Sequence, residues 1–439
     1  MAETVEIATG LGRLAGRREG NVVAFRGVPY AGPTARFAPP TPQAAWAGVR
    51  DAGSNGPIPP QARSRLAAVM GDFDAVQAED CHSLTIWTPA ADGRKRPVLF
   101  WIHGGGFSSG AGSLPWYDGA ALAAMGDIVV VTPNYRLGPF GYLFVPGLAP
   151  ANLGLQDQAA ALAWVAGHIG DFGGDPDAIT VGGQSAGGYS TALLLLQQGS
   201  RRPIRRAILQ SAPLSLAPLA AARAIELGKM FLEQLDGDPL TLPADRLLAA
   251  QGRVAAAIAR PGDPTPPFMP VASGELDRDW QAAVTEVAGL VDSLAGATAH
   301  EMAAFVPMTA DNRAGITAGG EALFNTPTHD HAMQAEAAGR HAWLYRFDWS
   351  SPDASRGACH CLELPFLLGR AGAWDEAPMM AGADPAAVAA LSATIQRAWI
   401  GFVRDGDPGT TDRPWPAWRR QAPTALSLDV PATDFAWTA

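Results

Sequence analysis

The segment at residues 180–188 (TVGGQSAGG) constrains the fold of this 439-residue chain more than any other. It places a G-x-S-x-G motif, centred on Ser185, between a short β-branched run at residues 178–181 and an apolar run at residues 190–198. The first run predicts a buried strand and the second a buried helix. A tight turn between them exposes the serine hydroxyl and points the N–H groups of the helix at it. We therefore predict that Ser185 is a nucleophile on an α/β fold.

A second G-x-S-x-G match is centred on Ser108, but no helix-like run follows it, so Ser108 is the weaker candidate. It lies in a loop that begins with His103-Gly104-Gly105-Gly106 directly after a strand-like run at residues 98–102. Three consecutive glycines leave backbone N–H groups uncovered, so such a loop can contribute to an oxyanion hole.

The composition excludes several classes of function. The net charge of −10 and a pI of about 5.3 argue against nucleic acid and anionic membranes as partners. The N-terminus shows no secretory signal and no apolar run is long enough to span a membrane, so we expect a cytoplasmic protein. The scarcity of lysine, with only Lys95 and Lys229, indicates a GC-rich bacterial genome. Cys359 and Cys361 flank a histidine, but a fourth ligand is missing, so we expect no metal and no cofactor.

Strand-like and helix-like segments alternate along most of the chain, which predicts a mainly parallel, doubly wound sheet. The runs at residues 84–87 and 98–102 are expected to pair with each other, and residues 1–60 to form a hairpin followed by a long surface connection. Residues 1–439 are expected to form one domain, with helical insertions at about 215–285 and 305–335 that form a lid or substrate-binding subdomain. The last helix is expected near residues 386–404.

An activated serine needs a base and an acid, which follow it in the order serine, acid, histidine in α/β-hydrolases. Among the five later histidines, only His360 lies in a loop after the strand-like run at residues 341–347, so we predict His360 as the base. The acid is expected after the preceding strand, where Glu301 lies, with Asp311 as the alternative.

These motifs, together with several blocks along nearly the whole chain, resemble the type-B carboxylesterases, which include bacterial p-nitrobenzyl esterases, mammalian carboxylesterases and cholinesterases. The further blocks are FRGVPYA at residues 25–31, EDC at 79–81, NYRLGPFG at 134–141, NLGLQDQ at 152–158, FGGDP at 172–176 and WPAW at 415–418.

The resemblance implies an α/β-hydrolase fold and a triad of Ser185, Glu301 and His360. It also implies oxyanion-hole donors at Gly105, Gly106 and Ala186, and supporting roles beside the triad for Gln184 and Ser211. Residues expected around the substrate are Phe107, Leu216, Pro218, Leu219, Phe268 and Phe366.

The chain departs from the family pattern in informative places. Gln184 and Met302 stand where the family usually has Glu and Gly, and the 59-residue spacing between Glu301 and His360 is short, which indicates a trimmed helical subdomain and a more open entrance. No cysteine stands near residues 57–60, where the family's usual partner of Cys81 would fall, so we expect Cys81 to be a free thiol.

The resemblance implies a serine carboxylesterase that acts on small neutral esters through an acyl-enzyme. The same triad could act on carbamate, amide or thioester bonds, and a non-catalytic interaction protein is the remote alternative. The segment at residues 213–219 is aliphatic and Gln184 carries no charge, so we expect an apolar, roomy acyl pocket and no preference for choline esters. The sequence leaves monomer and dimer open.

Overall fold

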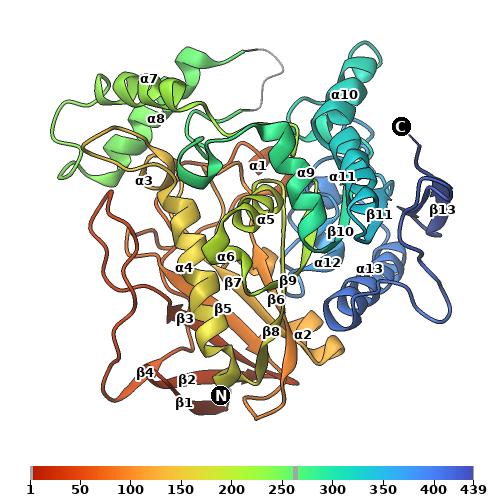
Figure 1. Cartoon of the computed structure of the whole chain (residues 1–439), viewed down its shortest axis with the longest axis horizontal. Coiled ribbons are helices and arrows are strands. Elements are labelled where there is room, and N and C mark those ends of the chain that lie inside the picture. Colours follow the sequence, from red (N-terminus) through yellow and green to blue (C-terminus); the bar gives the residue numbers. More distant parts are fainter. Residues whose placement is uncertain (1–2, 261–264, 439) are drawn as a thin grey trace.

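The computed structural model describes residues 3–260 and 265–438, and a central sheet organises them (Figure 1). Within these residues thirteen strands form one sheet, in the order β1-β2-β3-β5-β7-β6-β8-β9-β10-β11-β12-β13, with β4 beside β2. The strands are β1 (Thr4–Thr9), β2 (Gly12–Glu19), β3 (Val22–Pro29), β4 (Val49–Asp51), β5 (Ser83–Thr88), β6 (Arg96–Ile102), β7 (Val129–Pro133), β8 (Gly174–Gln184), β9 (Ile204–Gln210), β10 (Asp292–Thr298), β11 (Ala342–Phe347), β12 (Thr424–Leu428) and β13 (Thr433–Ala436).

The sheet is parallel from β7 to β12 and antiparallel at both ends, apart from the short β4, which is parallel to β2. This agrees with the predicted α/β class, but the expected pairing of β5 with β6 is wrong. Strand β7 lies between them, antiparallel to β5 and parallel to β6. The N-terminal hairpin is present as β1 and β2, and the chain then continues the antiparallel pairing into β3.

Both faces of the central strands are buried, as expected for a parallel sheet covered by helices. In β6, Val98 and Phe100 belong to one core cluster, while Leu99 and Trp101 belong to the other. Helices α4 (Leu153–His168), α5 (Ala186–Leu196), α9 (Trp280–Leu290) and α11 (Thr326–Ala337) pack on the first face, and α2 (Ala120–Gly126) and α13 (Pro385–Asp405) on the second.

Both segments expected to be helical insertions contain helices, some of which lie outside the central layers while others pack on the sheet (Figure 1). Residues 215–285 include α7 (Ala221–Leu232), α8 (Ala244–Ile258) and the start of α9, and residues 305–335 include α10 (Arg313–Gly320) and most of α11. The remaining short helices are α1 (Ala67–Met70), α3 (Gly138–Tyr142), α6 (Gln198–Arg201) and α12 (Leu364–Leu367).

Helix α13 is long and apolar enough to cross a membrane by length and composition alone, although the sequence was expected to hold no such segment. Its side chains Leu391, Trp399 and Phe402 are nevertheless buried against the sheet, in the second core cluster. Core helices reach the same composition for this reason, so α13 is no evidence of a membrane span.

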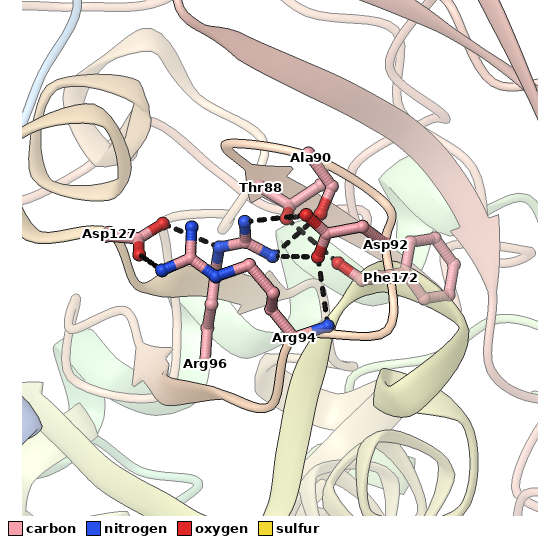
Figure 2. A network of polar contacts seen from close by, with 7 residues as sticks. All are labelled: Thr88, Ala90, Asp92, Arg94, Arg96, Asp127 and Phe172. Carbon is pink, nitrogen blue, oxygen red and sulfur yellow. Dashed lines mark hydrogen bonds and ion pairs between the residues drawn. The ribbon is translucent and has the colours of Figure 1, made fainter.

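A polar network joins several chain segments around the amino end of β6 (Figure 2). The guanidinium of Arg96, the first residue of β6, donates to Asp127 at 2.7 Å, to Asp92 at 3.0 Å and to the carbonyl of Ala90 at 3.1 Å. Thr88 donates to the carbonyl of Phe172 at 2.9 Å, which ties the end of β5 to the start of β8. The network fixes loops at the edge of the sheet opposite to the site described next.

Candidate active site

The residues singled out in the sequence all follow the carboxyl ends of neighbouring parallel strands. The glycine loop follows β6, Ser185 follows β8, Ser211 follows β9, Glu301 follows β10 and His360 lies in the loop after β11. Parallel strands end at the same edge of a sheet, and ligands of open α/β sheets bind there. The topology therefore collects residues from five separate segments at one edge.

Ser185 stands at a strained turn between β8 and α5. Its backbone has φ 57° and ψ −123°, and its N–H donates to the carbonyl of Gln210 at 2.8 Å. The turn needs a residue without a side chain two positions later, because a Cβ on Gly187 would lie 2.0 Å from the carbonyl oxygen of Ile102. Ala186 is the first residue of α5, where helical N–H groups have no carbonyl partner within the helix.

His360 and Glu301 form a buried pair. Nδ1 of His360 is hydrogen-bonded to Oε2 of Glu301, and Oε1 of the same carboxylate accepts from the N–H of Thr298 at 2.7 Å. Both side chains are fully buried. Burial alone lowers the pKa of His360, but its interactions with Cys361 and Glu301 raise that pKa well above the usual value. The pair therefore stabilises an imidazolium, the species that a general base becomes.

Gln184, the residue before Ser185, connects the turn at Ser185 to this pair. Its amide nitrogen lies 3.3 Å from Nε2 of His360, and its amide oxygen accepts from the thiol of Cys361 at 3.4 Å. Because Nδ1 faces a carboxylate, the imidazole proton belongs on Nδ1, and Nε2 keeps its lone pair as an acceptor. The ring nitrogen that lies next to the amide of Gln184, Nε2, is therefore the one that can accept a proton.

A second buried carboxylate, Glu363, was not recognised in the sequence. Its Oε1 lies 3.5 Å from both Nε2 of Gln210 and Oγ of Ser211, and its other oxygen has no hydrogen-bond partner among the described residues. Burial, with the nearby charge of Glu301, raises the pKa of Glu363 to about 7. The sequence feature that could have identified Glu363 is its position, three residues after His360 in the same loop.

The glycine loop approaches Ser185 with its backbone. A Cβ on Gly105, where φ is 110°, would lie 1.9 Å from the carbonyl oxygen of Ser109, so only glycine fits there. His103 anchors the loop: its ring stacks on Tyr135 with centroids 4.3 Å apart, and burial lowers its pKa to about 4. His103 is therefore neutral and packed in the core at the start of the loop.

A narrow cavity of about 70 Å³ opens at Ser185. Gly105, Gly106 and Ala186 line it, as does Tyr189. Most of its remaining wall is apolar, including Phe107, Leu216, Met269, Phe305 and Phe324. The cavity is apolar as expected, but its volume is smaller than the roomy acyl pocket that we expect from the sequence.

The residues expected around the substrate divide into two groups. Phe107 and Leu216 line the cavity at Ser185, and Leu219 lines a neighbouring one. Pro218, Phe268 and Phe366 line neither and are a correction to the prediction. Phe268 packs edge-on against Phe231, and Phe366 packs against Phe347 and Trp349, because both point into the core.

Two aromatic side chains of the site were missed in the sequence. The rings of Phe305 and Phe324 lie 5.6 and 5.0 Å from the imidazole of His360, centroid to centroid. They come from the helical segment between Glu301 and His360, where no motif marks them. They shield the buried pair and face the cavity.

The alternative nucleophile and the alternative acid that the sequence offers lie outside this group of residues. Ser108 lies in a turn, with its hydroxyl 3.4 Å from the carbonyl of Gly105, and Asp311 is exposed before α10. No group of three potential metal ligands occurs among residues 3–260 and 265–438. Cys81, Cys359 and Cys361 are free and buried, which agrees with the expected free thiol at Cys81.

A strained serine after one central parallel strand, with a carboxylate-bound histidine in the loop after another strand of the same sheet, is the arrangement of an α/β-hydrolase. The family model described as "Carboxylesterase family" matches residues 2–319 and 316–436. The chain therefore belongs to the carboxylesterase family and is a carboxylic ester hydrolase.

Three bacterial relatives match this chain over nearly their full length. The chain is 37% identical to a probable N-octanoylanthranilate hydrolase of Rhodococcus erythropolis, over 95% of this chain and 96% of the relative. It is 35% identical to the para-nitrobenzyl esterase of Bacillus subtilis, over 97% and 95%, and 35% identical to the phenmedipham hydrolase of Pseudarthrobacter oxydans, over 95% and 94%. All three organisms are bacteria.

The fold matches solved structures equally well. A PNB esterase superimposes with a TM-score of 0.89 at 32% identity, over 98% of this chain and 96% of that chain. A Geobacillus stearothermophilus carboxylesterase gives 0.85 at 32% identity, over 98% and 97%.

Proposed function

We propose that Ser185 is the nucleophile, His360 the general base and Glu301 the acid of this hydrolase. His360 Nε2 takes the proton of the Ser185 hydroxyl as its oxygen attacks the ester carbonyl, and the oxyanion is bound by the N–H groups of Gly105, Gly106 and Ala186. The protonated His360 then gives its proton to the leaving alcohol. Water then attacks the acyl-enzyme with His360 again as base, and the carboxylic acid product leaves Ser185.

One observation carries this proposal: the buried hydrogen bond between His360 and Glu301, beside the turn that exposes Ser185. A carboxylate on Nδ1 holds the imidazole in the tautomer in which Nε2 accepts a proton. Gln184 and Ser211 act behind the triad, Gln184 by orienting Nε2 of His360 and Ser211 by contacting Glu363.

We propose uncharged acyl groups as the part of the substrate that enters the cavity at Ser185. Its wall holds Leu216, Met269, Phe305 and Phe324, and no tryptophan or carboxylate lines it within the described residues. Each acyl methylene that fits adds up to about 0.8 kcal/mol of binding, so specificity rises from acetyl towards butyryl or hexanoyl esters.

A panel of p-nitrophenyl acetate, butyrate and hexanoate, with acetylcholine as the cationic comparison, tests this assignment through kcat/KM. We expect the butyrate or hexanoate ester to be the best substrate. A marked preference for acetylcholine over the uncharged esters would contradict the proposal.

Amide and carbamate bonds are the second candidate, and the names of two relatives favour including them. One is named for N-octanoylanthranilate and the other for phenmedipham. A p-nitroanilide and a carbamate analogue with the same acyl length, assayed beside the ester, decide between the bonds. We expect the ester to react fastest, because a phenol leaves more readily than an aniline and because the nitrogen of a carbamate makes its carbonyl less electrophilic.

Further parts of the proposal concern the setting of the enzyme. We propose that residues at about 215–285 and 305–335 form a lid or substrate-binding subdomain on the single domain, because both segments supply residues to the cavity. We further propose a bacterial, cytoplasmic enzyme that needs no cofactor and acts as a monomer or dimer.

A further inference from the structure

The side chain of Gln184 lies in the middle of the site, although it takes no part in the bond changes proposed above. It is fully buried, directly before Ser185, and its amide contacts the imidazole of His360. A Cβ built on Gly104 would lie 3.0 Å from the amide oxygen of Gln184, so this side chain also packs against the glycine loop. Gln184 therefore contacts the segments of the proposed nucleophile, base and oxyanion hole.

The two ends of this amide have opposite hydrogen-bonding roles. The amide nitrogen faces Nε2 of His360 at 3.3 Å, and the amide oxygen faces Sγ of Cys361 at 3.4 Å. An amide nitrogen donates and an amide oxygen accepts. Rotation of the amide by half a turn would exchange the two atoms. The orientation of Gln184 therefore decides whether His360 meets a donor or an acceptor.

The thiol of Cys361 favours the orientation that the structure shows. Burial raises the pKa of this thiol, and the imidazolium of His360 lowers it by less, so Cys361 keeps its proton at neutral pH. The thiol donates this proton to the amide oxygen of Gln184. After rotation of the amide, the thiol would face an NH₂ group, which cannot accept the proton.

The backbone at Cys361 is strained. Its φ is 73°, a left-handed conformation that favours glycine over a residue with a β-carbon. Phe107, Ser185 and Ser211 also have positive φ, and all three lie at the same site. Local strain of this kind gathers at functional sites. A side chain at position 361 therefore has a conformational cost, which a role for the thiol would explain.

The orientation of the amide bears on the charge of the base. Neutral His360 accepts from the amide at Nε2, whereas the imidazolium carries a proton there and would meet the amide N–H groups. A donor at this nitrogen thus favours the neutral ring. Glu301 acts in the opposite direction and raises the pKa of His360. The donor end of Gln184 therefore helps to keep the base able to accept a proton.

Other titratable or charged groups lie around the imidazole and its neighbours. Burial raises the pKa values of the two tyrosines among them, so both stay neutral. Substitutions of Cys361 or Gln184 leave all these groups in place, and a comparison of such variants isolates the effect of the amide. The groups are Tyr117 after the glycine loop, Glu301 after β10, Tyr345 on β11, and Cys359 and Glu363 in the loop of His360, with Arg356 near Cys359.

We propose that Cys361 is a positioning residue, whose thiol holds the amide of Gln184 with its nitrogen towards His360 and its oxygen away from it. Cys361 acts on the reaction only through Gln184. The inference rests on the proposed function, because it assumes that His360 is the base.

The pH profile of kcat/KM for p-nitrophenyl butyrate tests the proposal. Cys361→Ala frees the amide, so that its oxygen can turn to the imidazolium and stabilise it. The acidic limb should then move to higher pH by about half a unit to one unit, while the alkaline plateau changes little. Cys361→Ser keeps a donor and should restore the limb of the wild type.

Further variants separate this effect from a general disturbance of the loop. Cys361→Gly suits the left-handed backbone, so it keeps the fold even if Cys361→Ala does not, and it should show the same shift. Cys359→Ala, the same change on the other side of His360, is the matched control and should leave the limb in place.

A double variant tests whether Gln184 is the connection. In a Gln184→Met background the amide is absent, so adding Cys361→Ala should not move the limb. An unchanged limb in both Cys361→Ala and Cys361→Gly, a move to lower pH, or a shift that persists in the Gln184→Met background would overturn the proposal.

Titration of His360 by NMR in a Ser185→Ala background separates this inference from the proposed chemistry. The signal is assigned by its loss in His360→Gln, and it reports the imidazole itself, so titration of Glu363 near its pKa of about 7 does not enter. A shift caused by Cys361→Ala, in an enzyme whose hydrolysis survives His360→Gln, would sink the base assignment and keep the inference. Hydrolysis that depends on His360, with the same titration in both proteins, would do the reverse.

Discussion

The two edges of the central sheet hold polar networks of opposite character. At the amino end of β6, Arg96 meets Asp92 and Asp127, so each charge faces an opposite one (Figure 2). At the carboxyl ends, Glu301 and Glu363 both lie near the one imidazole of His360. The first network is balanced, whereas the second gathers two carboxylates around one base.

The pKa values follow from this difference. The hydrogen bond from Arg96 lowers the pKa of Asp92 to about 2, so this carboxylate stays ionised at neutral pH. Burial raises the pKa of Glu363 to about 7, and the pKa of His360 lies well above its usual value. Perturbed titrations of this kind gather at functional sites, while satisfied ion pairs stabilise structure. Substitutions at the two edges should therefore affect different properties.

The largest effect is expected at the carboxyl edge. Ser185→Ala removes the only oxygen that could form the acyl-enzyme in our proposal, so kcat should fall by about a millionfold, as for serine hydrolases in general. The melting temperature should hardly change. Ser108→Ala is the matched control, since Ser108 belongs to the other G-x-S-x-G match, and its effect on ester hydrolysis should be mild. Equal losses in the two variants would contradict the assignment.

Glu301→Gln should lower kcat by about a thousandfold to ten-thousandfold, because the imidazolium loses its compensating charge. It should also move the pH profile. His360 works as a base only when neutral, so activity is lost as pH falls through its pKa. Removing a negative neighbour lowers that pKa, and the acidic limb of kcat/KM should shift to lower pH.

Asp311→Asn is the control for the acid, because Asp311 was the alternative in the sequence. It should leave both rate and profile unchanged. A damaging Asp311→Asn beside a harmless Glu301→Gln would show that the acid has been misassigned.

At the amino edge the expected loss is in stability. Arg96→Met removes one donor from the carbonyl of Ala90 and one from each of two carboxylates, so the melting temperature should fall by a few degrees. Calorimetry on the purified variant measures this, and kcat/KM at 25 °C should remain that of the wild type. Arg94→Met removes an exposed partner of Asp127 and should lower the melting temperature by less than Arg96→Met does. A loss of kcat/KM in a folded Arg96→Met variant would contradict the view that the amino edge serves stability and the carboxyl edge serves catalysis.

The sequence predicted the parts of the site that local motifs mark. The turn at Ser185 and the glycine loop are short segments whose backbone geometry depends on their own glycines, as Gly105 and Gly187 illustrate. Strand order was harder: β5 and β6 are neighbours in sequence, yet β7 lies between them, because the chain crosses over before it pairs.

The side chains that shape the cavity were beyond the sequence for a related reason. Phe305, Phe324 and Arg65 reach the site from segments whose paths depend on tertiary packing, and no spacing rule identifies them. Phe366 shows the opposite error. It lies six residues after His360, but its ring points into the core against Phe347 and Trp349. The closeness of Phe366 to His360 in sequence correctly places both in one chain segment, but it does not show that the ring of Phe366 faces the core and not the cavity.

The smallest effect concerns Asp92, and its sign depends on pH. A carboxylate whose folded pKa is about 2, against about 3.9 in an unfolded chain, stabilises the fold above pH 4 and loses this contribution as pH falls towards 2. Because Asp92 is exposed, Asp92→Asn should lower the melting temperature at pH 7 by only on the order of 1 °C.

Measured at several pH values, this small difference between wild type and Asp92→Asn should shrink between pH 4 and pH 2, where the wild-type carboxylate becomes protonated and resembles the amide. The hydrolysis of p-nitrophenyl butyrate at pH 7 should be the same for both proteins. A difference in melting temperature that stays constant into acid would mean that the Asp92 side chain contributes through its shape and hydrogen bonds, with no part played by its charge. The ion pair of Asp92 with Arg96 would then add nothing to the stability of the amino edge, and balanced charge would not be what distinguishes this edge from the carboxyl edge.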